Sequence, residues 1–290
     1  MLVLMFIHGA KMKFARYWAK KEVENETSIF WQKKLSVWGS SNESQEQAAI
    51  NAENRRHLMT DFFSGHHERG DDYEYWTGVI KEEILLERQN KDGEPLAIIS
   101  RNGYGAAVLN TSNVVFGDID VFAPSFVDRF LQLFGREKKD KSYYLALIEA
   151  YQKHHPDLAF RVYETHSGLR FILTNKLYAP TDKFVDTLFS DLNVDPLYVH
   201  LCKKQECFRA RLTPKPWRIG MPRPASRFPR SEQSSINEFQ QWLGEYNAAS
   251  VKATSAKYIA SYGEHRSHQD VQTVIEIHDQ HIARTDVELA

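Results

Sequence analysis

Residues 113–122, with the sequence Asn113-Val-Val-Phe-Gly-Asp-Ile-Asp-Val-Phe122, are the stretch on which the fold prediction depends. The β-branched and aromatic residues are typical of a buried β-strand, which ends in two aspartates, Asp118 and Asp120. Because side chains alternate between the two faces of a strand, both carboxylates point to the same side. An unpaired buried carboxylate is costly. We therefore expect positive charge opposite the pair, from a divalent metal or from arginines on neighbouring strands.

The composition is that of an ordinary globular protein. Of the 290 residues, 42% are hydrophobic and 26% are charged, which is enough for a large core and excludes a disordered chain. The two cysteines are too few for a secreted disulfide framework. The apolar opening is too short for a signal peptide or a membrane span. We expect a soluble, cytoplasmic protein that does not engage a membrane.

The expected elements divide the chain into three parts. Residues 1–95 are expected to form a mainly helical N-terminal elaboration, and residues 96–220 the core. Residues 221–290 are expected to form a proline-rich basic linker followed by C-terminal helices. Outside the core, helices are predicted at 45–63, 76–88, 235–248, 251–262 and 268–281. Inside it, strands are predicted at 96–100, 106–109, 113–122, 159–164, 169–173 and 207–212, with helices at 125–134, 182–192 and 195–201 and one ending at 155.

From the aspartate strand onward, the predicted order is strand, helices, strand, tight turn, strand, helices, strand. This is the split β-α-β-β-α-β pattern of a ferredoxin-like sheet, in which the first strand is central. The two aspartates are then expected between Arg170 on the third strand and Arg209 and Arg211 on the fourth, on an open face. The predicted fold class is α+β, with an RRM-like or ferredoxin-like antiparallel core, an N-terminal helical elaboration and a C-terminal helical cap.

A basic segment accompanies and follows the last core strand. Between Lys203 and Arg230 there are nine Lys or Arg residues, one acidic residue and half of the ten prolines. Such a segment is either a solvated linker or a surface for nucleic acid. In the second case Trp217 or Phe228 would stack on bases, which favours single strands. The cations expected to contact phosphates are Arg209, Arg211, Lys215, Arg218 and Arg223.

Two motifs of the core resemble the palm of the archaeo-eukaryotic primase and primase-polymerase superfamily. Val114-Val-Phe-Gly-Asp-Ile-Asp120 is similar to the hhhDhD/E motif that ends the first palm strand. Tyr163-Glu-Thr-His-Ser-Gly-Leu-Arg170 is similar to the later histidine motif at the expected hairpin. The resemblance covers residues 96–217. It departs from the family in two ways: Phe171 stands where the usual register has histidine, and no third acid lies near 207–212.

The resemblance implies a metal-dependent nucleotidyl or phosphoryl transferase that acts on nucleotides or nucleic acid. Asp118 and Asp120 would hold Mg²⁺ or Mn²⁺, since paired carboxylates suit hard cations that activate phosphoryl groups. His166 would contact a nucleotide phosphate or relay a proton. Guanidinium and ammonium groups bind phosphate oxygens, so the phosphate ligands would be Arg170, Arg209, Arg211, Lys215 and Arg218.

Non-catalytic alternatives remain open. The two aspartates can pair with Arg209 and Arg211 in a structural ion network. A turn histidine such as His166 is commonly exposed to solvent. The same sheet and basic segment can form a non-catalytic module that binds single-stranded nucleic acid, and an ion-paired sheet also suits a protein-interaction subunit. His200, Cys202 and Cys207 provide only three ligands, one too few for structural zinc.

Overall fold

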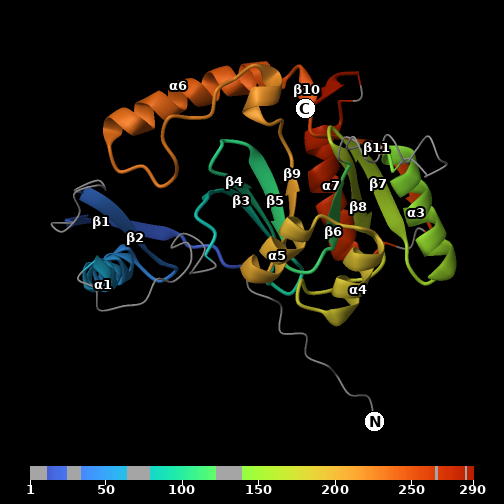
Figure 1. The fold of residues 1–290 in the computed structure, drawn as a ribbon, viewed down its shortest axis with the longest axis horizontal. Coiled ribbons are helices and arrows are strands. Elements are labelled where there is room, and N and C mark those ends of the chain that lie inside the picture. Colours follow the sequence, from blue (N-terminus) through green and yellow to red (C-terminus); the bar gives the residue numbers. More distant parts are fainter. Residues whose placement is uncertain (1–11, 25–33, 64–78, 122–138, 265–266, 285) are drawn as a thin grey trace, which may run out of the picture.

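The structure, a computed structural model, describes residues 12–24, 34–63, 79–121, 139–264, 267–284 and 286–290 (Figure 1). Its fold class is α+β, as predicted: two four-stranded antiparallel sheets pack with helices. No helix in the described ranges has the length and apolar character needed to cross a membrane. The predicted helix at 125–134 lies outside the described residues.

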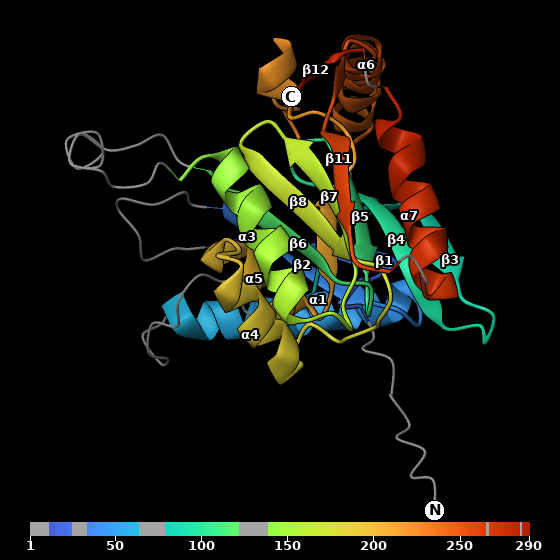
Figure 2. The same ribbon diagram turned by 90° about the vertical axis from the view of Figure 1, so that its right-hand side faces the viewer.

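The first sheet contains the aspartate strand and has the strand order β11-β7-β8-β6. Helices cover both of its faces: α3 and α4 lie on one side and α7 on the other (Figure 2). The strands are β6 (Phe116–Asp120), β7 (Phe160–Thr165), β8 (Gly168–Leu173) and β11 (Ala256–Tyr262), and the helices are α3 (Lys141–His154), α4 (Lys183–Asp191) and α7 (Gln269–Ile282).

The second sheet has the order β3-β4-β5-β9. Its β4–β5 hairpin was predicted correctly, and the Asn102 side chain closes the turn by accepting from the backbone nitrogens of Tyr104 and Ala106 at 3.2 and 3.1 Å. The strands are β3 (Glu83–Gln89), β4 (Pro95–Arg101), β5 (Ala107–Thr111) and β9 (Phe208–Arg211), and α5 (Pro196–Gln205) precedes β9.

The predicted strand order is right for β6 and β8 but wrong for the fourth strand. β9 pairs with β5, so β6 is the edge strand of its sheet and not a central one. The Tyr198 hydroxyl lies between β6 and β9. It donates to the Phe116 carbonyl at 2.9 Å and accepts from the Arg209 backbone nitrogen at 3.2 Å. The Tyr198 side chain of α5 therefore takes up backbone groups that would pair with each other if β6 and β9 formed a ladder.

A close approach fixes the pairing of β6 with β8. Gly168 opens β8, and a Cβ atom at this position would overlap the carbonyl oxygen of Ile119. Only glycine allows the two backbones to lie this near to each other. The register that follows places Asp118 opposite Arg170.

The described part of the N-terminal third contains strands as well as a helix. β1 (Tyr17–Glu24) and β2 (Lys34–Ser41) form an antiparallel pair against which α1 (Gln45–Phe63) packs. The α1 helix was predicted correctly, but the helix predicted at 76–88 is wrong over residues 83–88, which belong to β3, and residues 76–78 lie outside the described residues. Pairing with β4 outweighs the local helical pattern there.

The C-terminal region completes the first sheet. α6 (Gln233–Ser250) and α7 confirm two predicted helices, while the helix predicted at 251–262 is wrong. That stretch forms β10 (Ala253–Thr254), which pairs with β12 (Glu288–Leu289), and β11, which extends the sheet beside β7. Between β9 and α6 the chain forms a 3₁₀ helix, η1 (Pro216–Ile219).

Candidate functional site

Asp118 is held in a bidentate ion pair with Arg170. The Nε atom of Arg170 donates to one carboxylate oxygen at 2.8 Å and Nη2 donates to the other at 3.3 Å. The Arg170 side chain is only 2% exposed, whereas that of Asp118 is 30% exposed. A buried guanidinium requires a partner of opposite charge. Asp118 supplies it, so this aspartate is in a structural ion pair, but its partner is Arg170 and not Arg209 or Arg211, which the structural alternative named.

The face that carries this pair is covered by α7, so the prediction of an open charged face is wrong. His278 of α7 is fully buried, and its Nε2 lies 3.4 Å from Nη1 of Arg170. Its Nδ1 lies 3.0 Å from the Asp279 carboxylate. Asp279 also accepts from Arg161 and from the Tyr163 hydroxyl, each at 2.7 Å. We call these residues the buried polar network: Asp118, Arg161, Tyr163, Arg170, His278 and Asp279.

Charges alternate along the buried polar network. Burial lowers the pKa of His278 to about 4, so its ring is neutral at pH 7. Burial opposes the ionised form of Asp279, but hydrogen bonds from His278 and Tyr163 and the charge of Arg161 outweigh it and lower the pKa of Asp279. The network therefore contains two ion pairs, Asp118–Arg170 and Arg161–Asp279, which are joined by the neutral imidazole of His278.

Asp120 lies at the exposed end of β6. Burial of part of its carboxyl group and the like charges of Asp118 and Asp195 raise its pKa, and the charges of Lys215 and Arg218 oppose that rise. Asp195 is the acid that the sequence prediction missed. Its backbone nitrogen donates to the Asp118 carbonyl at 3.1 Å. Its only visible role in the sequence is as the cap before Pro196, which gives no sign of this tertiary contact.

The predicted metal ligands do not form a complete donor set within the described residues. No group of three or more His, Cys, Asp or Glu side chains is arranged there to hold a metal ion. Both carboxylate oxygens of Asp118 accept from Arg170. Those of Asp195 accept from the backbone at the start of α5, at 3.2 and 3.3 Å. A cation at Asp120 would have to displace these bonds to gain further ligands.

Arg209 and Arg211 do not flank the aspartates as predicted, because they lie on β9 in the other sheet. Arg209 donates to both carboxylate oxygens of Glu82 at 2.6 and 2.7 Å, in a largely buried pair. Arg211 donates to the carbonyls of Thr213 and Ala290 at 2.9 and 3.0 Å. Burial, together with the charges of nearby arginines, lowers the pKa of Arg211 to about 10.

His166 lies in the turn between β7 and β8 and is exposed. Its Nδ1 is 3.1 Å from the carbonyl oxygen of Leu289. The neighbouring Ser167 accepts a hydrogen bond from Arg218 at 2.7 Å. The turn is thus connected to the basic segment through Ser167, and the catalytic role of His166 stays a prediction.

The basic segment presents an aromatic ring surrounded by cations. Trp217 is 45% exposed. Lys215 Nζ and Arg223 Cζ lie 5.6 and 4.7 Å from the centre of its ring. Tyr104, from the β4–β5 turn, packs edge-on against it at 5.3 Å. We call this region the Trp217 surface; its residues are Tyr104, Lys215, Trp217, Arg218 and Arg223.

This segment is packed against the protein and is not a solvated linker. The Tyr246 hydroxyl of α6 donates to the Pro214 carbonyl at 2.7 Å, and the Trp242 indole donates to the Pro222 carbonyl at 2.9 Å. Gly220, with a positive φ of 74°, ends η1. Residues on both sides of Trp217 are therefore fixed by α6.

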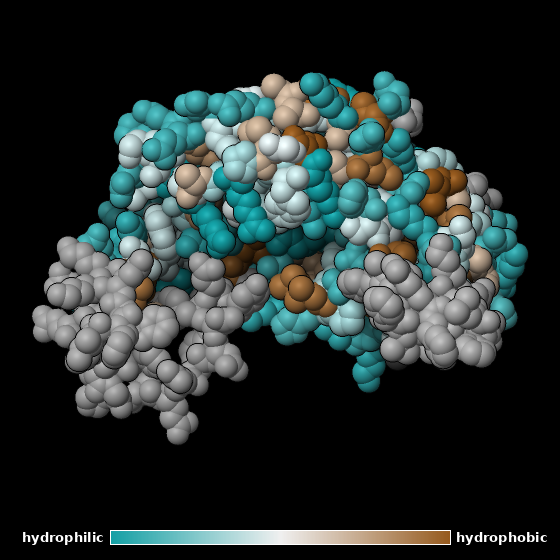
Figure 3. Space-filling view, turned by 45° about the horizontal axis from the view of Figure 1, so that its top comes forward, coloured by the Kyte–Doolittle hydropathy of each residue, from teal (hydrophilic) through white to brown (hydrophobic). Residues whose placement is uncertain are grey.

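The cations of the Trp217 surface crowd one another. Burial, followed by the charges of Arg218 and Arg211, lowers the pKa of Lys215. Burial also lowers the pKa of Arg218. A bound anion would relieve this repulsion. The view in Figure 3 shows mostly hydrophilic residues, with hydrophobic ones in separate patches among the coloured atoms.

No family model, curated protein or solved structure matches this chain. The resemblance to the primase-polymerase palm therefore stays a prediction, and the geometry of the described residues carries the functional argument.

Proposed function

We propose that this protein binds single-stranded nucleic acid through the Trp217 surface. The observation that carries the proposal is the exposed ring of Trp217 with Lys215 and Arg223 against it. Exposed aromatic rings stack on unpaired bases, while Lys and Arg neutralise the adjacent phosphates. This combination is the one expected of a single-strand binding site.

The charge balance supports a polyanion as ligand. Arg218 and Lys215 have lowered pKa values, for which burial is the main cause, and Asp120 offsets their charge only in part. Phosphates placed beside them would stabilise the charged forms of both side chains. Arg209, predicted to take part, is not included because Glu82 already neutralises it.

The aromatic component supports single strands over duplex. In a duplex the flat faces of the bases are stacked on each other, and a side chain reaches only their edges. Trp217 can stack on a base only where that base is unpaired. Its position is held by Tyr104 and by the α6 contacts to Pro214 and Pro222, so little ordering is needed on binding.

The test is fluorescence anisotropy with labelled DNA and RNA single strands and a duplex of equal length. Trp217→Ala should weaken single-strand binding about 5- to 100-fold, the effect of losing one stacked base. Tyr258→Ala is the matched control, since Tyr258 is 47% exposed and has Arg161 4.1 Å from its ring centre. Equal affinity of wild type and Trp217→Ala, or equal binding of duplex, would contradict the proposal.

A metal-dependent transfer reaction on nucleotides is the second proposal. It is favoured by Asp120, whose partly buried carboxyl group lies near the like charges of Asp118 and Asp195, so that a cation would be stabilised there. Its test is nucleotide incorporation on a primed template with Mg²⁺ or Mn²⁺. Asp120→Asn should abolish incorporation without unfolding the protein, because Asp120 is exposed. Incorporation that persists in Asp120→Asn, or is absent from the wild type, would remove this candidate.

A further inference from the structure

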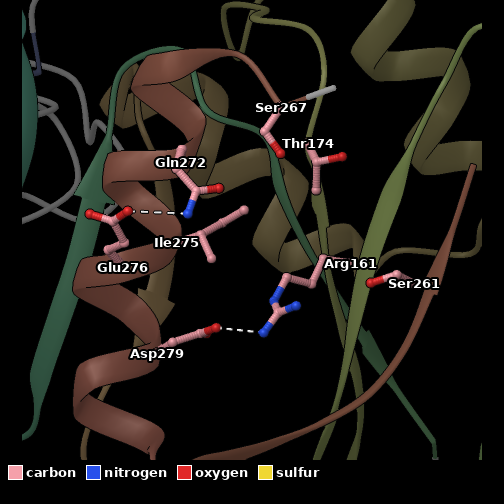
Figure 4. Close-up of a pocket in the computed structure, with 8 residues that line it drawn as sticks. All are labelled: Arg161, Thr174, Ser261, Ser267, Gln272, Ile275, Glu276 and Asp279. Atoms are coloured by element: carbon pink, nitrogen blue, oxygen red, sulfur yellow. Dashed lines mark hydrogen bonds and ion pairs between the residues drawn. The ribbon is translucent and has the colours of Figure 1, made fainter. Parts of the chain in front are cut away.

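The pocket of about 360 Å³ between α7 and the β7–β11 edge is lined mainly by polar side chains that bond to one another (Figure 4). Arg161 donates to Asp279 at 2.7 Å, and Gln272 donates to Glu276 at 3.1 Å. These charged groups are engaged within the protein, so the pocket sets no pattern of charge for a ligand. The β1–β2 pair provides stronger evidence of a ligand surface.

One face of the β1–β2 pair is packed against α1. Side chains alternate between the two faces of an antiparallel pair, so the odd-numbered residues of both strands share one face. On this face Val23 and Val37 are only 1% and 2% exposed. A Cβ atom at Gly39 would overlap the backbone of Ala52 in α1. The even-numbered residues therefore point away from α1, which lies below the strand pair in Figure 1.

The face turned away from α1 carries aromatic rings and cations. The register pairs Lys20 with Trp38, so these two side chains are neighbours, and Trp18 lies two residues from Lys20 on the same face. The Nζ atom of Lys81, which precedes β3, lies 5.2 Å from the centre of the Trp38 ring. All four side chains are partly exposed. We call Trp18, Lys20, Trp38 and Lys81 the β1–β2 surface.

The basic segment joins the β1–β2 surface to the Trp217 surface. Phe228 packs edge-on against Trp18, with the ring centres 6.1 Å apart. The preceding residue, Arg227, is exposed and lies over the β4–β5 turn, since a Cβ atom at Gly103 would be 3.8 Å from its Cδ atom. The next residue of that turn is Tyr104, which belongs to the Trp217 surface. Aromatic and cationic side chains therefore continue from one surface to the other.

We propose that the β1–β2 surface is a second stacking platform for the single strand that binds the Trp217 surface. This inference rests on the proposed function and extends it to the length of the ligand, because full affinity then requires a strand that reaches both surfaces. Trp18 and Trp38 stack on unpaired bases, while Lys20 and Arg227 neutralise phosphates of the same strand. The N-terminal unit of β1, β2 and α1 thereby contributes to nucleic-acid binding.

Anisotropy titration of the full chain with a labelled oligothymidylate of about 20 nucleotides tests this proposal, because that length exceeds the usual site sizes. Trp38→Ala should weaken binding about 5- to 100-fold, the effect of losing one stacked base. Tyr17→Ala is the matched control: Tyr17 is 38% exposed but lies on the odd-numbered face, so its loss should leave the affinity unchanged. Unchanged affinity in Trp38→Ala, or an equal loss in Tyr17→Ala, would overturn the proposal.

The salt dependence of binding gives a second test, which stays decisive if Trp38→Ala does not fold. Lys20→Gln should reduce the slope of log affinity against log salt by about 0.7, the value for one phosphate contact on a single strand. Lys21→Gln should keep the wild-type slope, because Lys21 lies on the α1 face and pairs with Glu53 at 3.4 Å. The same slope in Lys20→Gln as in the wild type would contradict the assignment.

Failure of this inference is distinguishable from failure of the proposed function. If the wild type binds the strand and Trp217→Ala weakens binding, while Trp38→Ala and Lys20→Gln behave as the wild type does, only the β1–β2 surface is eliminated. If the wild type does not bind the strand at all, the proposed function fails as well.

Discussion

Arg170 and Asp118 face each other across two antiparallel strands, and both carboxylate oxygens accept from one guanidinium that solvent hardly reaches. The same guanidinium donates to the Arg211 carbonyl of the other sheet at 2.9 Å. One buried side chain therefore joins the two sheets. Its partner Asp118, which makes this burial possible, is also one of the two aspartates that the sequence marks as candidate metal ligands.

Asp118→Ala should destabilise the protein by about 3–5 kcal/mol, because it leaves Arg170 charged and buried without its partner. Urea unfolding measures the change. Glu149→Ala is the control: Glu149 pairs with Lys153 on the exposed side of α3, where such pairs contribute about 0.3–0.5 kcal/mol. The double variant Asp118→Leu and Arg170→Met should recover much of the free energy of unfolding that Asp118→Ala loses. A double variant as unstable as the sum of the single ones contradicts this account.

Gly168→Ala should unfold the protein or severely destabilise it, since the new Cβ would overlap the carbonyl oxygen of Ile119 in the neighbouring backbone. Gly244→Ala provides the contrast. Nothing lies within 4 Å of a Cβ at Gly244, which is inside α6. There alanine should stabilise by about 0.5–1 kcal/mol, because glycine is a poor helix former. Thermal unfolding of the two variants would show opposite shifts, and shifts of the same sign would refute the assigned strand contact.

Stability should fall as the solution is acidified from about pH 6.5 towards pH 4, because His278 has a folded-state pKa of about 4 and an unfolded-state pKa of about 6.5. Between these values the unfolded chain binds a proton that the folded chain does not, so His278 stabilises fully above this window and progressively less within it. The groups that face it are Arg170, Asp279 and Tyr163.

The loss is on the order of 3 kcal/mol, from about 1.4 kcal/mol per pH unit. Urea unfolding across this pH window would measure it. His278→Gln should flatten the dependence, while His281→Gln, at an exposed position of the same helix, should keep it. A pH dependence that survives in His278→Gln assigns the titration to another group.

Salt dependence should separate the cations that contact phosphate from those that do not. Lys215→Gln and Arg223→Gln should each reduce the slope of log affinity against log salt by about 0.7, the value for one phosphate contact on a single strand. Arg209→Gln combined with Glu82→Gln removes a charge pair without leaving either partner alone, and the slope should stay that of the wild type. A reduced slope in this double variant would indicate that Arg209 contacts a phosphate of the nucleic acid.

Strand alternation was enough to predict that Asp118 and Arg170 are neighbours, since both positions follow from local pattern and one hairpin. It could not place Arg209, because its partner Glu82 lies 127 residues earlier in the chain. The insertion of Tyr198 between β6 and β9 and the covering of the charged face by α7 are likewise tertiary packing events. Periodicity within one segment carries no information about either.

The buried polar network also constrains how this sequence can diverge. The side chain of Arg170 is only 2% exposed, so an exchange of Asp118 alone leaves a charge inside the protein without its partner. Descendants of this chain can therefore alter these positions only in compensating sets. Joint replacement, rather than invariance of any one residue, is the evolutionary signature that this interior imposes.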